Sequence, residues 1–275
     1  MTLPDFLIIG AMKAGTTSLY RDLLTNPEIF MPLEKEPESL LSDEVLSGRG
    51  RAAYESLFAP SQPEQCCGEA STGYTKLPDH AGVPQRALQL LGPELRVVYL
   101  VRDPVKRIVS HHHHSVTTGV FSIDDVNIAV REYPQLLNWS RYAMQAQTWI
   151  DVFSRAQVRI VRFEEYVSHR RETVAELSTF VGVTPRPELV EVDRIFNQSE
   201  GKPVPTTGWK RVRNSRLYRF TVRPLLSQGL RDRVRTMVMP KAPPPKGGPS
   251  DDTVAFIRAE LADDARALDA LIAQQ

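Results

Sequence analysis

The chain has 275 residues, enough for one large domain or two small ones with a buried core. Its 34 lysines and arginines against 33 aspartates and glutamates give a formal net charge of +1. This balance excludes a histone-like protein and an acidic solvating tail. With 41% hydrophobic and 24% charged residues, the composition is that of a globular protein, so the chain as a whole is not disordered. A near-zero net charge still allows a locally basic site.

Three features of the sequence bear on its compartment. Cys66 and Cys67 are neighbours, so they cannot join distant segments, and a bridge between them would be strained. No stretch approaches the roughly 20 apolar residues that a membrane-spanning helix needs. Pro4 and Asp5 precede the first apolar run, where a signal peptide would carry positive charge. We therefore expect a soluble cytoplasmic protein without a disulfide framework.

The first hundred residues alternate between apolar runs and amphipathic segments. Residues 5–10 (DFLIIG) form a fully apolar run that ends in glycine, as is typical of a buried parallel strand. A loop at 11–15 and a helix at 16–24 follow. Downstream we expect, in order, a short strand at 28–31, a charged irregular segment at 32–41, a short helix at 51–58, a strand within 65–71 and a helix at 84–91.

The same alternation continues after residue 94. Residues 95–101 (LRVVYLV) predict a second strong strand, which Arg102-Asp103-Pro104 ends, and Pro104 suits the first position of a helix at 105–117. Further elements are expected as a helix at 140–153, a strand at 158–163, a long amphipathic helix at 164–180 and a terminal helix at 251–272. This order predicts an α/β fold, a parallel sheet flanked by helices on both faces. We expect a single domain over 1–275, more irregular, basic and proline-rich from about 197 to 275.

A candidate phosphate-binding loop lies between the first strand and the first helix. In Gly10-Ala-Met-Lys-Ala-Gly15-Thr16-Thr17, backbone N–H groups and a helix N-terminus can surround a phosphate. The glycines have the spacing of the nucleotide-triphosphate P-loop, G-x-x-x-x-G-K-[ST], but Thr16 stands at the lysine position and Lys13 comes earlier. The coincidence of strand, glycines, lysine and hydroxyls favours anion binding over a turn that needs glycine for steric reasons alone.

Arg102 and Ser110 form a second candidate anion site. Arg102 leaves the 95–101 strand at its carboxyl end, where open α/β sheets bind ligands. Ser110 follows inside the next expected helix. A planar guanidinium and a hydroxyl can hold one phosphate between them. The alternative for Arg102 is an ordinary salt bridge at the end of a strand.

Together these segments resemble the sulfotransferases that use 3′-phosphoadenosine 5′-phosphosulfate (PAPS). FLIIGAMKAGTTSLYRDLL (6–24) resembles the family's loop for the 5′-phosphosulfate, VVYLVRDPVKRIVSHHHH (97–114) its 3′-phosphate motif, and RFEEYVSHRRETVAELSTFVGV (162–183) its late strand and helix. The resemblance is closer to the heparan-type and bacterial small-molecule branch than to the aryl-sulfotransferase branch. It implies a P-loop-like sheet, and it assigns the 5′-phosphosulfate to Lys13, Ala14, Gly15, Thr16, Thr17 and Ser18, and the 3′-phosphate to Arg102 and Ser110.

The same resemblance assigns a general base. In the heparan-type branch a glutamate follows the first helix, in a Lys-Glu-x-His-Phe-Phe segment. Residues 35–40 (KEPESL) align with that segment and place Glu36 at the catalytic position. The histidine and both phenylalanines are absent here, so Glu38 and Glu34 stay open as alternatives.

Four consecutive histidines, His111 to His114, are unsuited to a metal site. Consecutive helical side chains point about 100° apart, so four in a row cannot converge on one ion. The family has Ser-His-Tyr-x-His at this point, a pattern that His111 and His114 fit. We expect no metal, and a histidine here would line the acceptor pocket or act as an alternative base.

Further cations are expected outside the two phosphate motifs. The family's lysine in a Glu-Lys-x-Pro-x-Tyr segment is Ala70 here, so a second cation is either missing or comes from elsewhere, with Lys76 nearby. Residues 201–219 are rich in lysine and arginine. The resemblance assigns Lys210, Arg211 and Arg213 to a loop over the adenine and the 3′-phosphate, and a solvated loop is the alternative.

The resemblance therefore implies in-line transfer of a sulfuryl group from PAPS to a hydroxyl, or less favourably an amine, of a small-molecule, lipid or carbohydrate acceptor. Lys13 would stabilise charge on the leaving phosphate and Glu36 would take the acceptor's proton. One alternative is a P-loop kinase of a small metabolite, which Thr16 disfavours. The other is a non-catalytic anion- or polysaccharide-binding module. No nucleic-acid partner is expected, and the acceptor and oligomeric state stay open.

Overall fold

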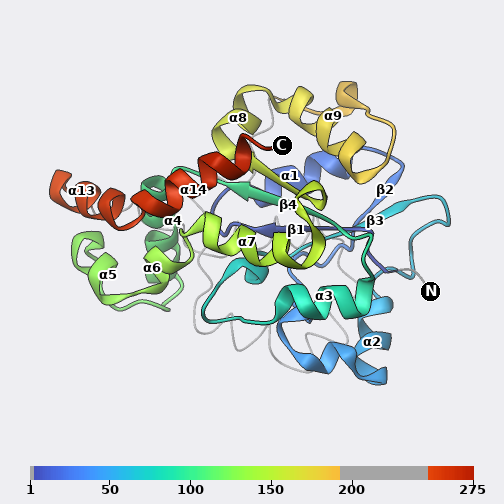
Figure 1. Ribbon diagram of the computed structural model, residues 1–275, viewed down its shortest axis with the longest axis horizontal. Coiled ribbons are helices and arrows are strands. Elements are labelled where there is room, and N and C mark those ends of the chain that lie inside the picture. The colour runs from blue at the N-terminus through green and yellow to red at the C-terminus, as the bar shows by residue number, and fades with distance from the viewer. Residues whose placement is uncertain (1–2, 193–246) are drawn as a thin grey trace, which may run out of the picture.

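The structure, a computed structural model, describes residues 3–192 and 247–275. Its centre is a parallel five-stranded sheet in the order β2-β3-β1-β4-β5 (Figure 1). The strands are β1 (Phe6–Gly10), β2 (Ile29–Phe30), β3 (Cys66–Ala70), β4 (Arg96–Val101) and β5 (Val158–Arg162). After β1 the chain forms β2 and β3 on one side of β1 and then β4 and β5 on the other side. The strand order therefore reverses beside β1. Ligands bind at such a switch point, at the carboxyl ends of the strands.

The apolar run of β1 is uninterrupted because both faces of the sheet are covered. Successive side chains of a strand point to opposite faces. Leu7 and Ile9 accordingly belong to one core, while Phe6 and Ile8 belong to the core on the other face. All four are fully buried. A strand buried on both sides reads as a continuous hydrophobic run, which is why this element is recognisable in the sequence.

Helices form layers on both sides of the sheet (Figure 1). The layer over Leu7 and Ile9 contains α2 (Gly48–Glu55), α3 (Val83–Leu91) and α7 (Tyr142–Phe153), with α14 (Ala262–Ile272) packed against α7. The opposite layer contains α1 (Thr16–Leu23), α8 (Phe163–Ser168) and α9 (Arg170–Val181). A third cluster joins α4 (Pro104–Thr117), α5 (Val126–Glu132), α6 (Gln135–Asn138) and α13 (Asp251–Glu260). The predicted parallel α/β sheet flanked by helices is confirmed.

Several element boundaries differ from the sequence predictions. The short helix expected at 51–58 begins at Gly48, because the Ser47 side chain accepts the Gly50 N–H at 3.0 Å and caps it. The expected helix 164–180 is interrupted at His169, and the expected helix 251–272 is interrupted at Leu261. Two helices, α5 and α6, were not expected. The remaining short elements are the 3₁₀ helices η1 (Ser39–Leu41), η2 (Asp43–Leu46), η3 (Thr72–Thr75), η4 (Arg155–Gln157) and η5 (Pro187–Leu189).

The two cysteines lie at the start of β3, and both are free thiols. Burial raises the pKa of the Cys66 thiol to about 12. Within residues 3–192 and 247–275, no helix has the length and apolar character that crossing a bilayer requires. The basic segment expected at 201–219 lies outside the described residues.

Candidate active site

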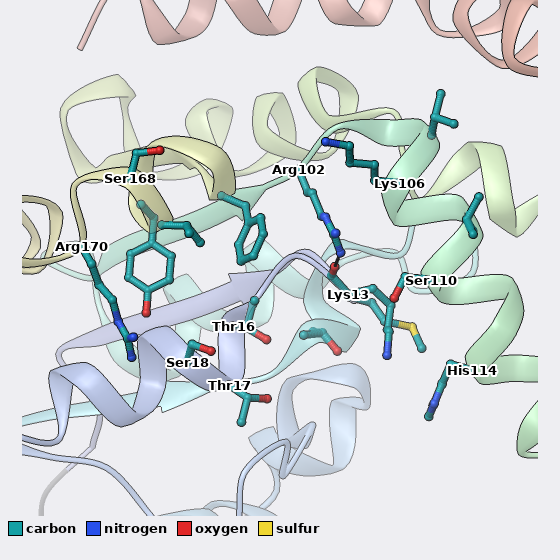
Figure 2. A pocket seen from close by; sticks show the side chains of 18 of the residues that line it. Lys13, Thr16, Thr17, Ser18, Arg102, Lys106, Ser110, His114, Ser168 and Arg170 are labelled. Atoms are coloured by element: carbon teal, nitrogen blue, oxygen red, sulfur yellow. Dashed lines mark hydrogen bonds between the residues drawn. The ribbon is translucent and has the colours of Figure 1, made fainter. Parts of the chain in front are cut away.

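A cavity of about 1390 Å³ opens where β1 and β4 end. The N-terminus of α1, one face of α4 and the α8–α9 junction surround it (Figure 2). The position agrees with the switch point of the sheet. Most of the site residues predicted from the sequence line this cavity. They are Lys13, Gly15, Thr16, Thr17, Ser18, Glu36, Arg102 and Ser110.

The phosphate-binding loop is shaped by a requirement for glycine at position 15. Gly15 is the N-cap of α1 and has φ 92°, a conformation that side chains rarely adopt. A Cβ at this position would also lie 2.5 Å from the ring of Phe163. Gly15 therefore lets the loop turn into α1 directly beneath that ring. The N-terminus of α1, with the positive end of the helix dipole, then faces the cavity, where it favours an anion.

Ala14 is placed differently from the other loop residues. It is fully buried, and its N–H donates to the Ala11 carbonyl at 3.1 Å. It does not line the cavity. Ala14 thus shapes the loop from the core side, while Thr16, Thr17 and Ser18 expose hydroxyl groups to the cavity (Figure 2).

Arg102 joins the two predicted phosphate sites. Its Nη1 donates to the Lys13 carbonyl at 3.2 Å, and its guanidinium carbon lies 5.0 Å from the centroid of the Phe163 ring. Its Nε is buried and has no hydrogen-bond partner in the part of the chain that the structure describes. Since a buried donor without a partner is unfavourable, this nitrogen is suited to an anionic ligand.

Ser110 reaches the same space from α4 (Figure 2). This helix begins where the sequence predicts, because Pro104 occupies its first turn and the Asp103 side chain accepts the Lys106 N–H at 2.8 Å. Lys106 also lines the cavity. It lies four residues after Arg102 and four before Ser110, so helical periodicity alone could have identified it.

Glu36 lies at the cavity, whereas the alternatives Glu34 and Glu38 do not line it. The Glu36 carboxylate pairs with Lys35 at 2.7 Å, and the same ammonium donates to Thr16 Oγ1 at 3.4 Å. Lys35 therefore connects the proposed base with the phosphate-binding loop. The Glu38 carboxylate instead lies against Gly73. Of the three candidate glutamates, Glu36 is therefore the one whose position at the cavity agrees with the sequence prediction.

The four histidines diverge, as their spacing predicts. His111 is buried and stacks on Trp139 with ring centroids 5.0 Å apart. Burial and the neighbouring cations lower its pKa to about 2. A ring nitrogen of His112 lies 2.9 Å from the Ile123 carbonyl, while His113 and His114 line the cavity. Within the described ranges, no group of three or more histidine, cysteine, aspartate or glutamate side chains is arranged to hold a metal ion.

Two more cations belong to the cavity wall. Lys76 lines the cavity, and its Nζ lies 4.8 Å from the centroid of the Trp139 ring. Arg170 was not predicted, because its position depends on the interruption of the helix at His169. Its charge is paired with Asp22 through two hydrogen bonds of 2.7 Å. Lys210, Arg211 and Arg213 lie outside the described residues.

The fold and the site define an α/β protein with a P-loop-like anion-binding loop at the switch point of a parallel sheet. The family described as the sulfotransferase domain matches residues 3–219, and the chain belongs to this family. The resemblance noted from the sequence motifs is therefore confirmed.

Two curated relatives illustrate the similarity. The bifunctional heparan sulfate N-deacetylase/N-sulfotransferase 4 of Mus musculus is 28% identical over 205 residues, which cover 66% of this chain and 23% of the relative. The heparan sulfate glucosamine 3-O-sulfotransferase 6 of Homo sapiens is 26% identical over 209 residues, covering 73% and 58%. The chain thus spans less than two thirds of the length of these relatives.

Solved structures show the same fold. A sulfotransferase from Alicyclobacillus acidocaldarius superimposes with a TM-score of 0.67 at 23% identity, covering 99% of this chain and 96% of the other. A mouse sulfotransferase complexed with PAP superimposes with a TM-score of 0.55 at 13% identity, covering 96% and 84%. At these identities the similarity concerns the fold.

Proposed function

We propose that this chain is an enzyme that transfers the sulfuryl group of PAPS to a hydroxyl group of an acceptor. One observation carries the proposal: Arg102, at the end of β4, contacts the main chain of Lys13 in a cavity that also contains Ser110 and the first turn of α1. A ligand with phosphate groups on both its 5′ and 3′ sides matches two neighbouring anion sites. Membership of the sulfotransferase family supports the same donor.

The residues present fit this donor better than they fit ATP. The buried Nε of Arg102 has no hydrogen-bond partner in the described part of the chain, and a 3′-phosphate would accept a hydrogen bond from it. A kinase of the P-loop type would need a lysine where Thr16 stands. We assign the 5′-phosphosulfate to Lys13, the hydroxyls of Thr16, Thr17 and Ser18, and the first N–H groups of α1. Lys210, Arg211 and Arg213 remain proposed contacts of the adenosine end.

The reaction is an in-line displacement at sulfur. A bond forms between the acceptor oxygen and the sulfur while the bond from sulfur to the oxygen of the 5′-phosphate breaks. Lys13 and the N–H groups of α1 stabilise the negative charge that develops on the leaving oxygen. Glu36 accepts the proton of the acceptor hydroxyl. The product of the donor is adenosine 3′,5′-bisphosphate (PAP), and most of the rate enhancement comes from positioning and charge stabilisation.

The acceptor is proposed by class. Relatives named as heparan sulfate and carbohydrate sulfotransferases support a carbohydrate, and a small molecule or lipid hydroxyl is the wider class. An amine is the less favoured nucleophile. We further propose that the chain functions as a single domain in the cytoplasm, where PAPS and an acceptor made in that compartment would meet.

The test is transfer of radiolabelled sulfate from PAPS to a panel containing desulfated heparan, simple glycosides and hydroxylated lipids. Lys13→Ala should lower turnover by about 100-fold or more, because it removes a charge that stabilises the transition state. Arg266→Ala is the matched control, since it removes an exposed cation of α14 outside the cavity. Circular dichroism checks that both variants fold. Full turnover by Lys13→Ala, or phosphate transfer from ATP in place of sulfuryl transfer, would refute the proposal.

A further inference from the structure

Glu69 is a fully buried carboxylate on β3, and its hydrogen-bond partners within the described part of the chain are hydroxyl groups. Tyr54 of α2 donates to its Oε2 and Ser71 donates to its Oε1 at 2.5 Å, while the nearby Tyr74 hydroxyl acts to lower its pKa. Its exposed fraction is 1%, and no ion pair reaches it among the described residues. Burial raises the pKa of Glu69, and the three hydroxyl donors oppose this effect. Burying a carboxylate without a counter-ion is energetically unfavourable, so a carboxylate kept at this position is expected to have a specific role.

The segment that carries Glu36 is attached to the protein immediately beside Glu69. Three N–H groups at alternate positions of residues 34–41 donate to the end of β3 and to η3. They are Glu36 N to the Ala70 carbonyl at 3.0 Å, Glu38 N to Ser71 Oγ at 3.1 Å and Leu40 N to the Tyr74 hydroxyl at 3.3 Å. Two of the three acceptors are therefore hydroxyl groups beside Glu69, and one of them, that of Ser71, donates to its carboxylate.

A hydroxyl group has one proton and two lone pairs, whereas an ionised carboxylate only accepts. A hydroxyl that gives its proton to Glu69 must present a lone pair to its other neighbour. For Ser71 that neighbour is the N–H of Glu38, and the Tyr74 hydroxyl, which also lies near Glu69, accepts the N–H of Leu40. The carboxylate thereby draws the hydroxyl protons away from these N–H groups, so that the oxygens can accept them.

We propose that Glu69 is a positioning residue, which orients the hydroxyls of Ser71 and Tyr74 so that they hold the segment carrying Glu36 at the cavity. This inference rests on the proposed function, because it gives Glu69 its role through the proposed base. Glu36 and Glu38 have φ values of 62° and 54°, in the left-handed region that non-glycine residues avoid. Such conformations persist only where the surroundings hold them, and the hydrogen bonds to Ser71 and Tyr74 do so.

The matched pair of variants is Glu69→Gln and Tyr54→Phe. A glutamine amide has one acceptor oxygen and one donor group, so it cannot take the protons of both segment-facing hydroxyls. Tyr54→Phe removes a hydrogen bond from the same carboxylate, but no hydrogen bond joins Tyr54 to residues 34–41 within the described part of the chain. A purely structural role of the buried cluster would make both variants alike in every measurement.

Hydrogen–deuterium exchange of residues 34–41 tests the proposal without a sulfuryl-acceptor substrate. Glu69→Gln should speed exchange of this segment by about fivefold, the effect of losing one ordinary hydrogen bond. Tyr54→Phe should leave that exchange within about twofold of the wild type. If Glu69→Gln does not fold, Ser71→Ala and Tyr74→Phe replace it, since each removes one acceptor directly.

Kinetics with labelled PAPS and the best acceptor of the panel provide the second readout. Glu69→Gln should lower kcat by about tenfold through displacement of Glu36, while its Kd for PAP by calorimetry stays within about twofold. Unchanged exchange and kcat in Glu69→Gln, or equal losses in Tyr54→Phe, would overturn the inference. If the wild type transfers no sulfate while Glu69→Gln still speeds exchange, the proposed function fails and the positioning of the segment stands.

Discussion

At the scale of single residues, backbone strain coincides with the predicted chemistry. Four non-glycine residues of the described chain have positive φ, and three of them, Lys13, Glu36 and Glu38, belong to the two loops at the active site. Their values are 69°, 62° and 54°. Each such conformation costs about 1–2 kcal/mol and is retained only where neighbouring contacts fix it. The strain indicates that both loops are held in shape before a ligand binds.

The identity of the base is tested by two isosteric substitutions. Glu36→Gln removes the proton acceptor at the cavity and should lower kcat by about 100-fold or more with an unchanged Kd for PAP. Glu38→Gln removes a carboxylate that lies against Gly73, so kcat should stay within about threefold of the wild type. Turnover of labelled PAPS and calorimetry separate the two effects. An active Glu36→Gln with an inactive Glu38→Gln would move the role of base to Glu38.

Residue patterns predicted many of the side chains that line the cavity, but not the contacts that hold them in place. Lys13, Arg102 and Ser110 could be found because each follows a recognisable strand at a fixed spacing. Glu69 could not, because its role depends on hydroxyl partners that are close only in the folded chain. Ala14 has the right place in the motif, yet backbone geometry turns it into the core.

At the scale of secondary-structure elements, an ion pair joins α1 to the far wall of the cavity. Asp22 of α1 accepts two hydrogen bonds from Arg170 of α9 and one from the Tyr166 hydroxyl of α8 at 2.5 Å. The Asp22 side chain is 3% exposed and that of Arg170 is 10% exposed. The interruption at His169 lets α8 and α9 both reach this carboxylate. A periodic pattern over 164–180 cannot reveal such an interruption, because it arises from a tertiary contact.

Asp22→Asn should therefore lower the free energy of unfolding by about 3 kcal/mol or more, since it leaves the Arg170 guanidinium without its counter-ion in the interior. Urea denaturation measures the change. Asp263→Asn is the matched control, because it removes one partner of an exposed pair with Arg266. The control should change stability by less than about 1 kcal/mol. Equal effects of the two substitutions would show that the Asp22 pair does not fasten α1 to α9.

At the scale of the whole molecule, the active site is assembled where the chain changes direction across the sheet. The loop after β1 and Arg102 after β4 come from segments about 90 residues apart in the sequence, yet adjacent parallel strands bring them together. Strand order was accessible only in general terms, since the sequence shows which segments are strands and not which strands pair. The formal net charge of +1 likewise does not show that several lysine and arginine side chains line one cavity.

His111 makes the stability of the folded protein depend on pH. Its pKa falls from about 6.5 when unfolded to about 2 when folded, because of burial and then of the charges on Arg107, Lys76, His114 and Lys13. Below about pH 6.5 the unfolded chain binds a proton that the native state does not, so stability falls with decreasing pH. Relative to His111→Phe, the wild type should lose about 2 kcal/mol of unfolding free energy between pH 7 and pH 5. Parallel profiles in urea denaturation would contradict this assignment.

In the proposed function, one cavity binds a nucleotide through phosphates on both its 5′ and 3′ sides. Calorimetric titration of the wild type and Arg102→Ala with PAP and with adenosine 5′-phosphate tests it directly. The wild type should bind PAP at least about tenfold more tightly, the worth of a charged hydrogen bond to the 3′-phosphate. Arg102→Ala should remove that difference while its affinity for adenosine 5′-phosphate stays within about twofold. Equal affinity of the wild type for both nucleotides would contradict binding through the 3′-phosphate.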